Sequence, residues 1–214
     1  MKTSQTGKGK IASIVGITIL VLIAWLYSIQ PEDLKPKSDL VVNTDATGQV
    51  PDEGIKCFDS SKYFAIQKSI PDSVGSNILV KFKSNSDQKM DCAYTPAKND
   101  FEITNDDAEY FLTFTDNYIL IDSGTGPEPR VLIAYNLNTG EKVYTDRYSK
   151  PVTTIANTIT YWSPSETKPS AENCPDLADF TSKGLGALIE SKISVDLDSH
   201  SITDSGETEC VATQ

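Results

Sequence analysis

Residues 110–137 read YFLTFTDNYILIDSGTGPEPRVLIAYNL, and this stretch decides the expected fold of the chain. In a strand, successive side chains point to opposite faces, and along this stretch apolar and aromatic side chains recur at every second position. This period of two is typical of half-buried β-strands. The apolar runs are separated by Asp116 and Asn117 and by a loop rich in glycine and proline, and these residue types favour turns. The stretch predicts three successive strands joined by turns, over residues 110–114, 118–122 and 130–137.

The same alternation continues on both sides of this stretch. Between Ile189 and Leu197, apolar side chains alternate with polar ones such as Glu190 and Lys192, which predicts a strand with one wet face. Strand spacings of 8–14 residues predict antiparallel hairpins. The expected fold class is mainly β, an antiparallel sandwich or open barrel with one short helix. The remaining predicted strands cover residues 63–69, 77–83, 88–94, 141–147, 157–162 and 207–212.

One short helix is predicted over residues 175–183. Pro175 suits the first helical position, because the N–H group that it lacks has no helical partner there. Asp176 in the first turn and Lys183 in the last turn match the helix dipole. Gly184 can adopt the left-handed conformation that ends many helices.

A membrane anchor is predicted near the N-terminus. Residues Ile11–Ile29 read IASIVGITILVLIAWLYSI, without charge or proline. As a helix this run would span about 28 Å, which matches a hydrocarbon core about 30 Å thick. Lys2, Lys8 and Lys10 precede the run and no acidic residue does, so the positive-inside rule places the N-terminus in the cytoplasm. A cleaved signal peptide is the alternative, although its apolar region would be only about 7–15 residues long.

The expected organisation is therefore that of a single-pass membrane protein whose main domain is periplasmic or extracellular. Residues 30–56, between the predicted anchor and the domain, contain three prolines and two glycines but no aromatic residue, as expected for a tether. The chain divides into a cytoplasmic tail (1–10), a signal-anchor transmembrane helix (11–29), a linker or stalk (30–56) and an extracytoplasmic β-rich domain (57–214).

All four cysteines lie in the predicted outer domain. An even number in an oxidising compartment predicts two disulfide bonds, for which three connectivities are possible. Pairing within each half of the domain, Cys57 with Cys92 and Cys174 with Cys210, is the favoured one. A metal site is the alternative, but the chain has no C-x-x-C motif and a single histidine.

The sequence ILIDSGT at residues 119–125 is similar to the signature of the aspartic proteases, two apolar residues followed by Asp, Ser or Thr, Gly, and Ser or Thr. The resemblance implies a catalytic role for Asp122, sharing a proton with a second aspartate from another lobe or subunit. A second Asp-Ser-Gly occurs at 204–206, but no apolar strand precedes it and only eight residues follow. The alternative interpretation is a simple loop over residues 123–127.

Several other chemistries have little support in the sequence. With 30 acidic and 19 basic residues the net charge is -11, which argues against nucleic-acid binding. No phosphate-binding glycine loop or dinucleotide fingerprint is present, so no cofactor is expected. His200 lies in a polar turn without a nucleophile elbow. Asp196, Asp198 and Asp204 suggest calcium or a solvated acidic turn, and their spacing does not match an EF-hand.

Together these features predict a membrane-anchored extracytoplasmic binding or interaction domain without evident catalysis. Residues 11–29 would contact the lipid bilayer. All 30 acidic residues but only 16 of the 19 basic ones follow the anchor, so the outer part has a charge of -14 and favours a cationic protein partner. The alternatives are an envelope hydrolase, aspartic-protease-like at Asp122, and an inhibitor of a basic extracellular hydrolase.

Overall fold

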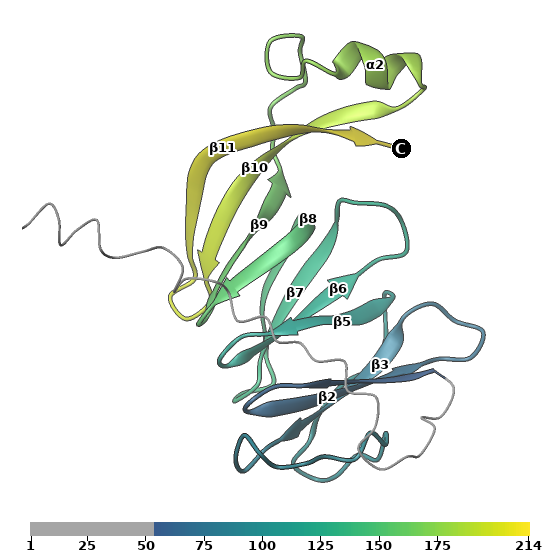
Figure 1. The fold of residues 1–214 in the computed structure, drawn as a ribbon, viewed down its shortest axis with the longest axis vertical. Helices are drawn as coiled ribbons and strands as arrows, with labels where there is room; N and C mark the ends of the chain where they lie inside the picture. Colours follow the sequence, from purple (N-terminus) through teal and green to yellow (C-terminus); the bar gives the residue numbers. More distant parts are fainter. Residues whose placement is uncertain (1–53) are drawn as a thin grey trace, which may run out of the picture. The chain divides into compact units, whose positions relative to one another are not determined.

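A computed structural model of the chain describes residues 54–214. These residues form eleven strands and one short helix, and every strand pairing is antiparallel (Figure 1). The predicted mainly β fold with one short helix is therefore confirmed. The predicted anchor, residues 11–29, lies outside the described residues, as does most of the predicted linker. Within 54–214, no helix is both long and apolar enough to cross a bilayer.

The first sheet has four strands in the order β1-β2-β3-β4. Its strands are β1 (Ile55–Asp59), β2 (Tyr63–Ser69), β3 (Ser76–Phe82) and β4 (Phe101–Ile103). The sequence pattern predicted β2 and β3 but not the two outer strands, which are short. Strand β1 also begins in the predicted linker, two residues before Cys57.

The second sheet is a seven-stranded meander in which neighbours in sequence are also neighbours in space, in the order β11-β10-β9-β8-β7-β6-β5. Such an arrangement follows from short turns between consecutive antiparallel strands. Its strands are β5 (Glu109–Phe114), β6 (Tyr118–Ser123), β7 (Arg130–Asn136), β8 (Lys142–Ile155), β9 (Thr158–Pro164), β10 (Gly186–Asp196) and β11 (Ser201–Thr213).

The seven-stranded sheet folds back on itself at β8. The first half of β8 pairs with β7 as far as Tyr148, and the second half pairs with β9 from Ser149 onward, with an irregular register. Pro151 lies in the irregular part, where its missing N–H group leaves a gap in the ladder. Beyond this bend, the Tyr118 hydroxyl on β6 donates to the Leu197 carbonyl at the end of β10, at 3.1 Å. In a flat sheet β6 and β10 would be four strand spacings apart, roughly 19 Å. The hydrogen bond between them therefore requires the sheet to fold back.

Asn157 lies in the β8–β9 turn and holds the folded-back halves together by joining this turn to two others. Its Oδ1 accepts hydrogen bonds from the Thr115 hydroxyl at 3.1 Å and from the Asn117 N–H at 3.0 Å, both in the β5–β6 turn. Its Nδ2 donates to Asp198 at 2.9 Å, and its carbonyl accepts the Leu197 N–H at 3.0 Å, both in the β10–β11 turn. One buried amide thus satisfies polar groups of all three hairpins.

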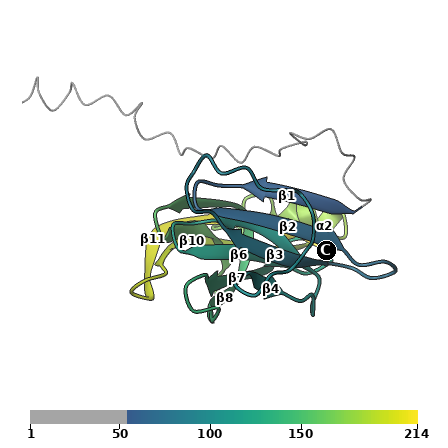
Figure 2. The ribbon, with the colours of Figure 1, turned by 90° about the horizontal axis from the view of Figure 1, so that it is seen from below.

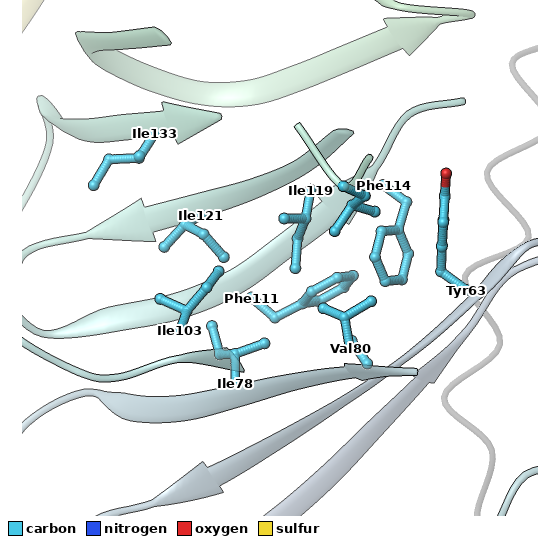
Figure 3. Close-up of a cluster of buried hydrophobic side chains, with 11 residues drawn as sticks. Tyr63, Ile78, Val80, Ile103, Phe111, Phe114, Ile119, Ile121 and Ile133 are labelled. Atoms are coloured by element: carbon cyan, nitrogen blue, oxygen red, sulfur yellow. The ribbon is translucent and has the colours of Figure 1, made fainter. Parts of the chain in front are cut away.

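The two sheets pack face to face across a shared apolar core (Figure 3). Seen from below, β2 and β3 overlie the second sheet (Figure 2), and β5 is the strand of that sheet that lies next to β2 and β3 (Figure 1). The buried amide of Gln67 adds a polar link, because its Oε1 accepts the Phe111 N–H at 2.8 Å, next to a register shift in β5. The core residues are Tyr63, Ala65, Ile78, Val80 and Ile103 from the first sheet, and Phe111, Phe114, Ile119, Ile121, Ile133 and Leu137 from the second sheet and the turn that follows β7.

A second core fills the fold in the seven-stranded sheet. It packs Tyr118 and Leu120 of β6 against Tyr161 of β9 and Val195 of β10. Because Ile119 and Ile121 of the same strand face the first core, β6 is buried on both faces along its whole length.

The segment 88–94, predicted as a strand, is not one. Its alternation is real, because Met90, Cys92 and Tyr94 pack on the outer face of the first sheet while the residues between them are exposed. However, this segment pairs with no strand among the described residues, and the Cys57–Cys92 disulfide holds it there instead. The prediction was wrong because side-chain packing alone produced a strand-like pattern.

The predicted cysteine pairing is confirmed. Cys57 is bonded to Cys92 and Cys174 to Cys210, with Cα–Cα distances of 5.8 and 5.2 Å, and residues 54–214 contain no free cysteine. Each bond closes a loop of about 35 residues, which in the chain-entropy model stabilises the fold by about 4 kcal/mol.

The short helix α2 (Leu177–Ser182) lies within the predicted range and ends as predicted, but it begins two residues after Pro175, with Asp176 as its N-cap. Gly184 has a φ of 73°, in the left-handed region. Its N–H donates to the Thr181 carbonyl and the Leu185 N–H donates to the Phe180 carbonyl, which is the Schellman arrangement of a helix C-terminus.

Candidate functional site

Asp122 lies at the end of β6, buried between two cationic side chains. Its Oδ1 accepts from Arg130 Nε at 2.7 Å, and its Oδ2 lies 3.1 Å from Lys150 Nζ. The Asp122 side chain is only 7% exposed. Strand β7 places Arg130 and the middle of β8 places Lys150, so the bend in β8 helps to build this cluster.

This arrangement supports a structural role for Asp122. Proton sharing in an aspartic protease needs a second carboxyl group beside the first. Within residues 54–214, the groups that bond to the Asp122 carboxylate are both cations. The loop after β6 is also anchored, because the Ser123 hydroxyl donates to the Asp107 carbonyl at 2.9 Å.

The second Asp-Ser-Gly forms a bulge in the exposed strand β11. The register of β10 and β11 shifts at this point, and Gly206 has a φ of 77°. Asp204 accepts the Gly206 N–H at 2.8 Å, and the Ser205 hydroxyl donates to the Lys192 carbonyl at 2.9 Å. Asp204 is therefore engaged in shaping the edge strand rather than meeting Asp122.

The acidic turn between β10 and β11 is held by its own hydrogen bonds. The Ser199 N–H and hydroxyl both donate to Asp196 Oδ1 at 2.8 Å, and they lower the pKa of this carboxyl. Asp198 accepts from Tyr118 and Asn157, as part of the fold-back contact. His200 is exposed in the same turn, with a φ of 57°. No group of three His, Cys, Asp or Glu side chains in the described part of the chain is placed to hold a metal ion.

Glu190 is a buried carboxyl group that the sequence analysis placed on the wet face of its strand. The prediction was wrong at this position, because Glu190 is 0% exposed. Its Oε1 accepts from the Ser149 hydroxyl, while its Oε2 has no hydrogen-bond partner among the described residues. Burial raises the pKa of Glu190, and the nearby Glu209 and Glu128 carboxylates raise it further.

The outer strand β11 is the most open part of the domain. Nine successive residues, Ser201–Glu209, are exposed, so neither face of this part of the strand is covered. Among the described strands it pairs with β10 alone, which leaves its outer backbone edge free, as Figure 1 shows. It also presents Ile202, whose exposed fraction is 60%.

Strand β11 differs from the other sheet edges in length and in charge. The edge strands β1, β4 and β5 have 5, 3 and 6 residues, whereas β11 has 13. Natural edge strands are usually short or carry lysine or proline, which prevent unwanted pairing. Strand β11 contains neither residue, and its charged side chains are all acidic: Asp204, Glu207 and Glu209. It is therefore the candidate interaction surface of the domain.

A shallow hollow of about 510 Å³ lies beside the Cys174–Cys210 disulfide. It is lined mainly by apolar side chains of the loop before α2 and of α2 itself, including Pro175, Leu177 and Ala178. The hollow lies near the end of β11, because Cys210 belongs to that strand.

Comparisons of the chain with protein-family models, with curated proteins and with solved structures found no match. The candidate site therefore rests on the residues and geometry described above.

The sequence contains one indirect signal of the open edge of β11. Strand β11 was predicted over residues 207–212 only, because the polar stretch before it lacks apolar alternation. That lack of alternation was itself informative, since a strand without a buried face must lie at the margin of a sheet.

Replacing Asp122 with alanine is expected to lower the free energy of unfolding by about 3–5 kcal/mol, because the Arg130 guanidinium would stay buried without its counter-charge. Chemical denaturation of the purified chain measures this change. In the double variant Asp122→Leu/Arg130→Met most of the loss should be recovered, since apolar side chains can replace a buried ion pair. A loss below about 1 kcal/mol for Asp122→Ala would contradict the structural role.

Glu190→Gln is expected to make the protein more stable than the wild type at pH 7.5. The folded-state pKa of Glu190 lies above its ordinary value of 4.5. The contribution of protonated Glu190 to folding stability is therefore fully present below about pH 4.5 and is lost as the pH rises through the folded pKa. Melting temperatures measured from pH 4 to 8 should therefore fall less steeply for Glu190→Gln. The exposed control Glu141→Gln should follow the wild type, and parallel curves for all three proteins would refute the assignment.

Proposed function

We propose that the protein is a membrane-anchored interaction module whose extracytoplasmic domain binds a partner protein through the outer edge of β11. The observation that carries the proposal is the length of that edge, 13 residues, of which the first nine are exposed. An unpaired strand edge offers a row of N–H and C=O groups, and proteins use such edges to recognise extended segments of their partners.

The anchor and the compartment complete the proposal. Residues 11–29 have the length and composition of a single membrane span, with the lysine-bearing tail 1–10 in the cytoplasm. Two disulfide bonds in a domain of this size support an oxidising compartment, the periplasm or the cell exterior. The part of the predicted stalk that precedes β1, residues 30–54, would hold the domain away from the bilayer surface.

Catalysis at Asp122 has less support than binding. Its carboxylate is engaged by two cations, and the second Asp-Ser-Gly serves a bulge. Some polar groups beside the second core are also engaged with one another: Tyr161 and Ser163 both donate to Asp146 Oδ2, at 2.8 and 3.1 Å. An open edge with free backbone groups is thus the feature of residues 54–214 that best fits a function.

Site-specific photo-crosslinking in intact cells tests this function. A photoreactive amino acid at Thr208, exposed on β11, is expected to give a discrete adduct with a partner protein. The matched control is Asn138, which is exposed in the β7–β8 turn on another part of the domain, and it should not give that adduct. The same adducts from both positions, or none from Thr208, would refute the proposed binding edge.

A further inference from the structure

We infer that the occupant of the β11 edge is an extended, cationic segment of a partner protein, which adds as a strand along residues 207–213. The inference rests on the proposed function and specifies the chemistry of the partner. It is carried by the placement of the bulge, by the charge of β11 and by the pairing of β10 with β11.

The bulge divides the edge and leaves one regular segment. The pairing of β10 with β11 is interrupted around Ser205 and Gly206 and is continuous from Thr208 to Thr213. The seven residues 207–213 span about 22–24 Å at 3.2–3.4 Å per residue, which lies within the usual range of strand lengths. The regular part is therefore long enough to pair with one strand, whereas only four residues, 201–204, precede the bulge.

The charge of the segment selects the partner. Glu207 and Glu209 are two residues apart, so they lie on the same face of β11. Glu207 already forms an ion pair with Lys192 on β10, with 3.2 Å between Glu207 Oε2 and Lys192 Nζ. Glu209, by contrast, is exposed and has no ion-pair partner among the described residues. A cationic side chain on an added strand, directly across from Glu209, would supply that partner.

The inner neighbour of Glu209 is acidic as well. In the register of the sheet Glu209 lies directly opposite Glu190 of β10. Like charges directly across two strands are unfavourable. A cation on the outer side of Glu209 would reduce this repulsion, while an acidic strand would extend it.

The same charges disfavour a second copy of this chain as the occupant. Antiparallel pairing of two β11 edges over residues 207–213 would bring the acidic side chains of both copies onto one short ribbon, without a lysine or arginine from either strand. A partner with alternating basic residues avoids that repulsion and satisfies the same backbone groups.

Three seven-residue peptides test the inference on the full chain in a non-ionic detergent, which avoids binding of cationic peptides to anionic lipid. VKVKVKV combines strand propensity with positive charge, VEVEVEV reverses the charge, and PKPKPKP keeps the charge but cannot form a regular strand ladder. Fluorescence anisotropy gives the Kd, and hydrogen exchange locates the protected amides. VKVKVKV is expected to bind about tenfold more tightly than either control and to protect residues 207–213.

A charge-reversed variant provides the control within the protein. Glu209→Lys is expected to weaken VKVKVKV binding two- to fivefold and to strengthen VEVEVEV binding. Glu141→Lys changes the net charge equally but lies in the β7–β8 turn, so it should leave both affinities unchanged.

Four outcomes would overturn the inference. Equal binding of PKPKPKP would show attraction by charge alone, and equal binding of VEVEVEV would show that charge does not select the partner. No binding at millimolar peptide would show that the edge does not accept strands, and a dimer that protects β11 without peptide would make a second copy the occupant. If VKVKVKV binds at 207–213 but Thr208 gives no adduct in cells, the proposed function fails while the strand chemistry stands.

Discussion

The structure depends on the burial of strand β6 on both faces. Tyr118 and Leu120 face one core while Ile119 and Ile121 face the other, so each side of the strand must be covered by a separate layer. The four-stranded sheet covers one side. The other side is covered by the sheet's own strands β9 and β10, and this requires the bend in β8 and the three-turn contact at Asn157. The apolar area buried on each side of β6 contributes about 25 cal/mol per Å² to stability.

The polar groups of the interior follow from the same constraint. Because β6 remains buried to its last residues, Asp122 lies inside the protein and needs the cations of Arg130 and Lys150. Strand β11, at the edge of the second sheet, is exposed where β6 is buried. The sheet has turned back over β6 by the time it reaches β10, and β11 adds a final strand that is exposed on both faces over nine residues. The domain therefore has a closed, ion-paired centre and an open acidic edge.

The sequence predicted what depends on local pattern and missed what depends on tertiary packing. The alternating runs gave β2, β3, β5, β6, β7 and β9 closely, and Gly184 gave the end of α2, because side-chain periodicity and left-handed glycine act locally. The cysteine pairing followed from position in the two halves. The strand-like segment 88–94 and the wet-face assignment of Glu190 were wrong, since a disulfide and a fold-back of the sheet decided them. For the site, the acidity of residues 31–214 was visible in the sequence, whereas the open edge was indicated only by the missing apolar alternation before residue 207, because sheet order is not encoded in any single strand.

The central claim is that β11 presents a free backbone edge while β6 is the most protected strand. Residue-resolved amide hydrogen exchange by NMR, on the full chain without a partner, tests this claim most directly. The account predicts the slowest exchange in β6, and in β11 an alternation in which amides that face β10 are protected while their neighbours exchange nearly as fast as in an unfolded chain. Protection of consecutive amides throughout residues 207–213 would contradict the account, because it would mean that the edge is already covered.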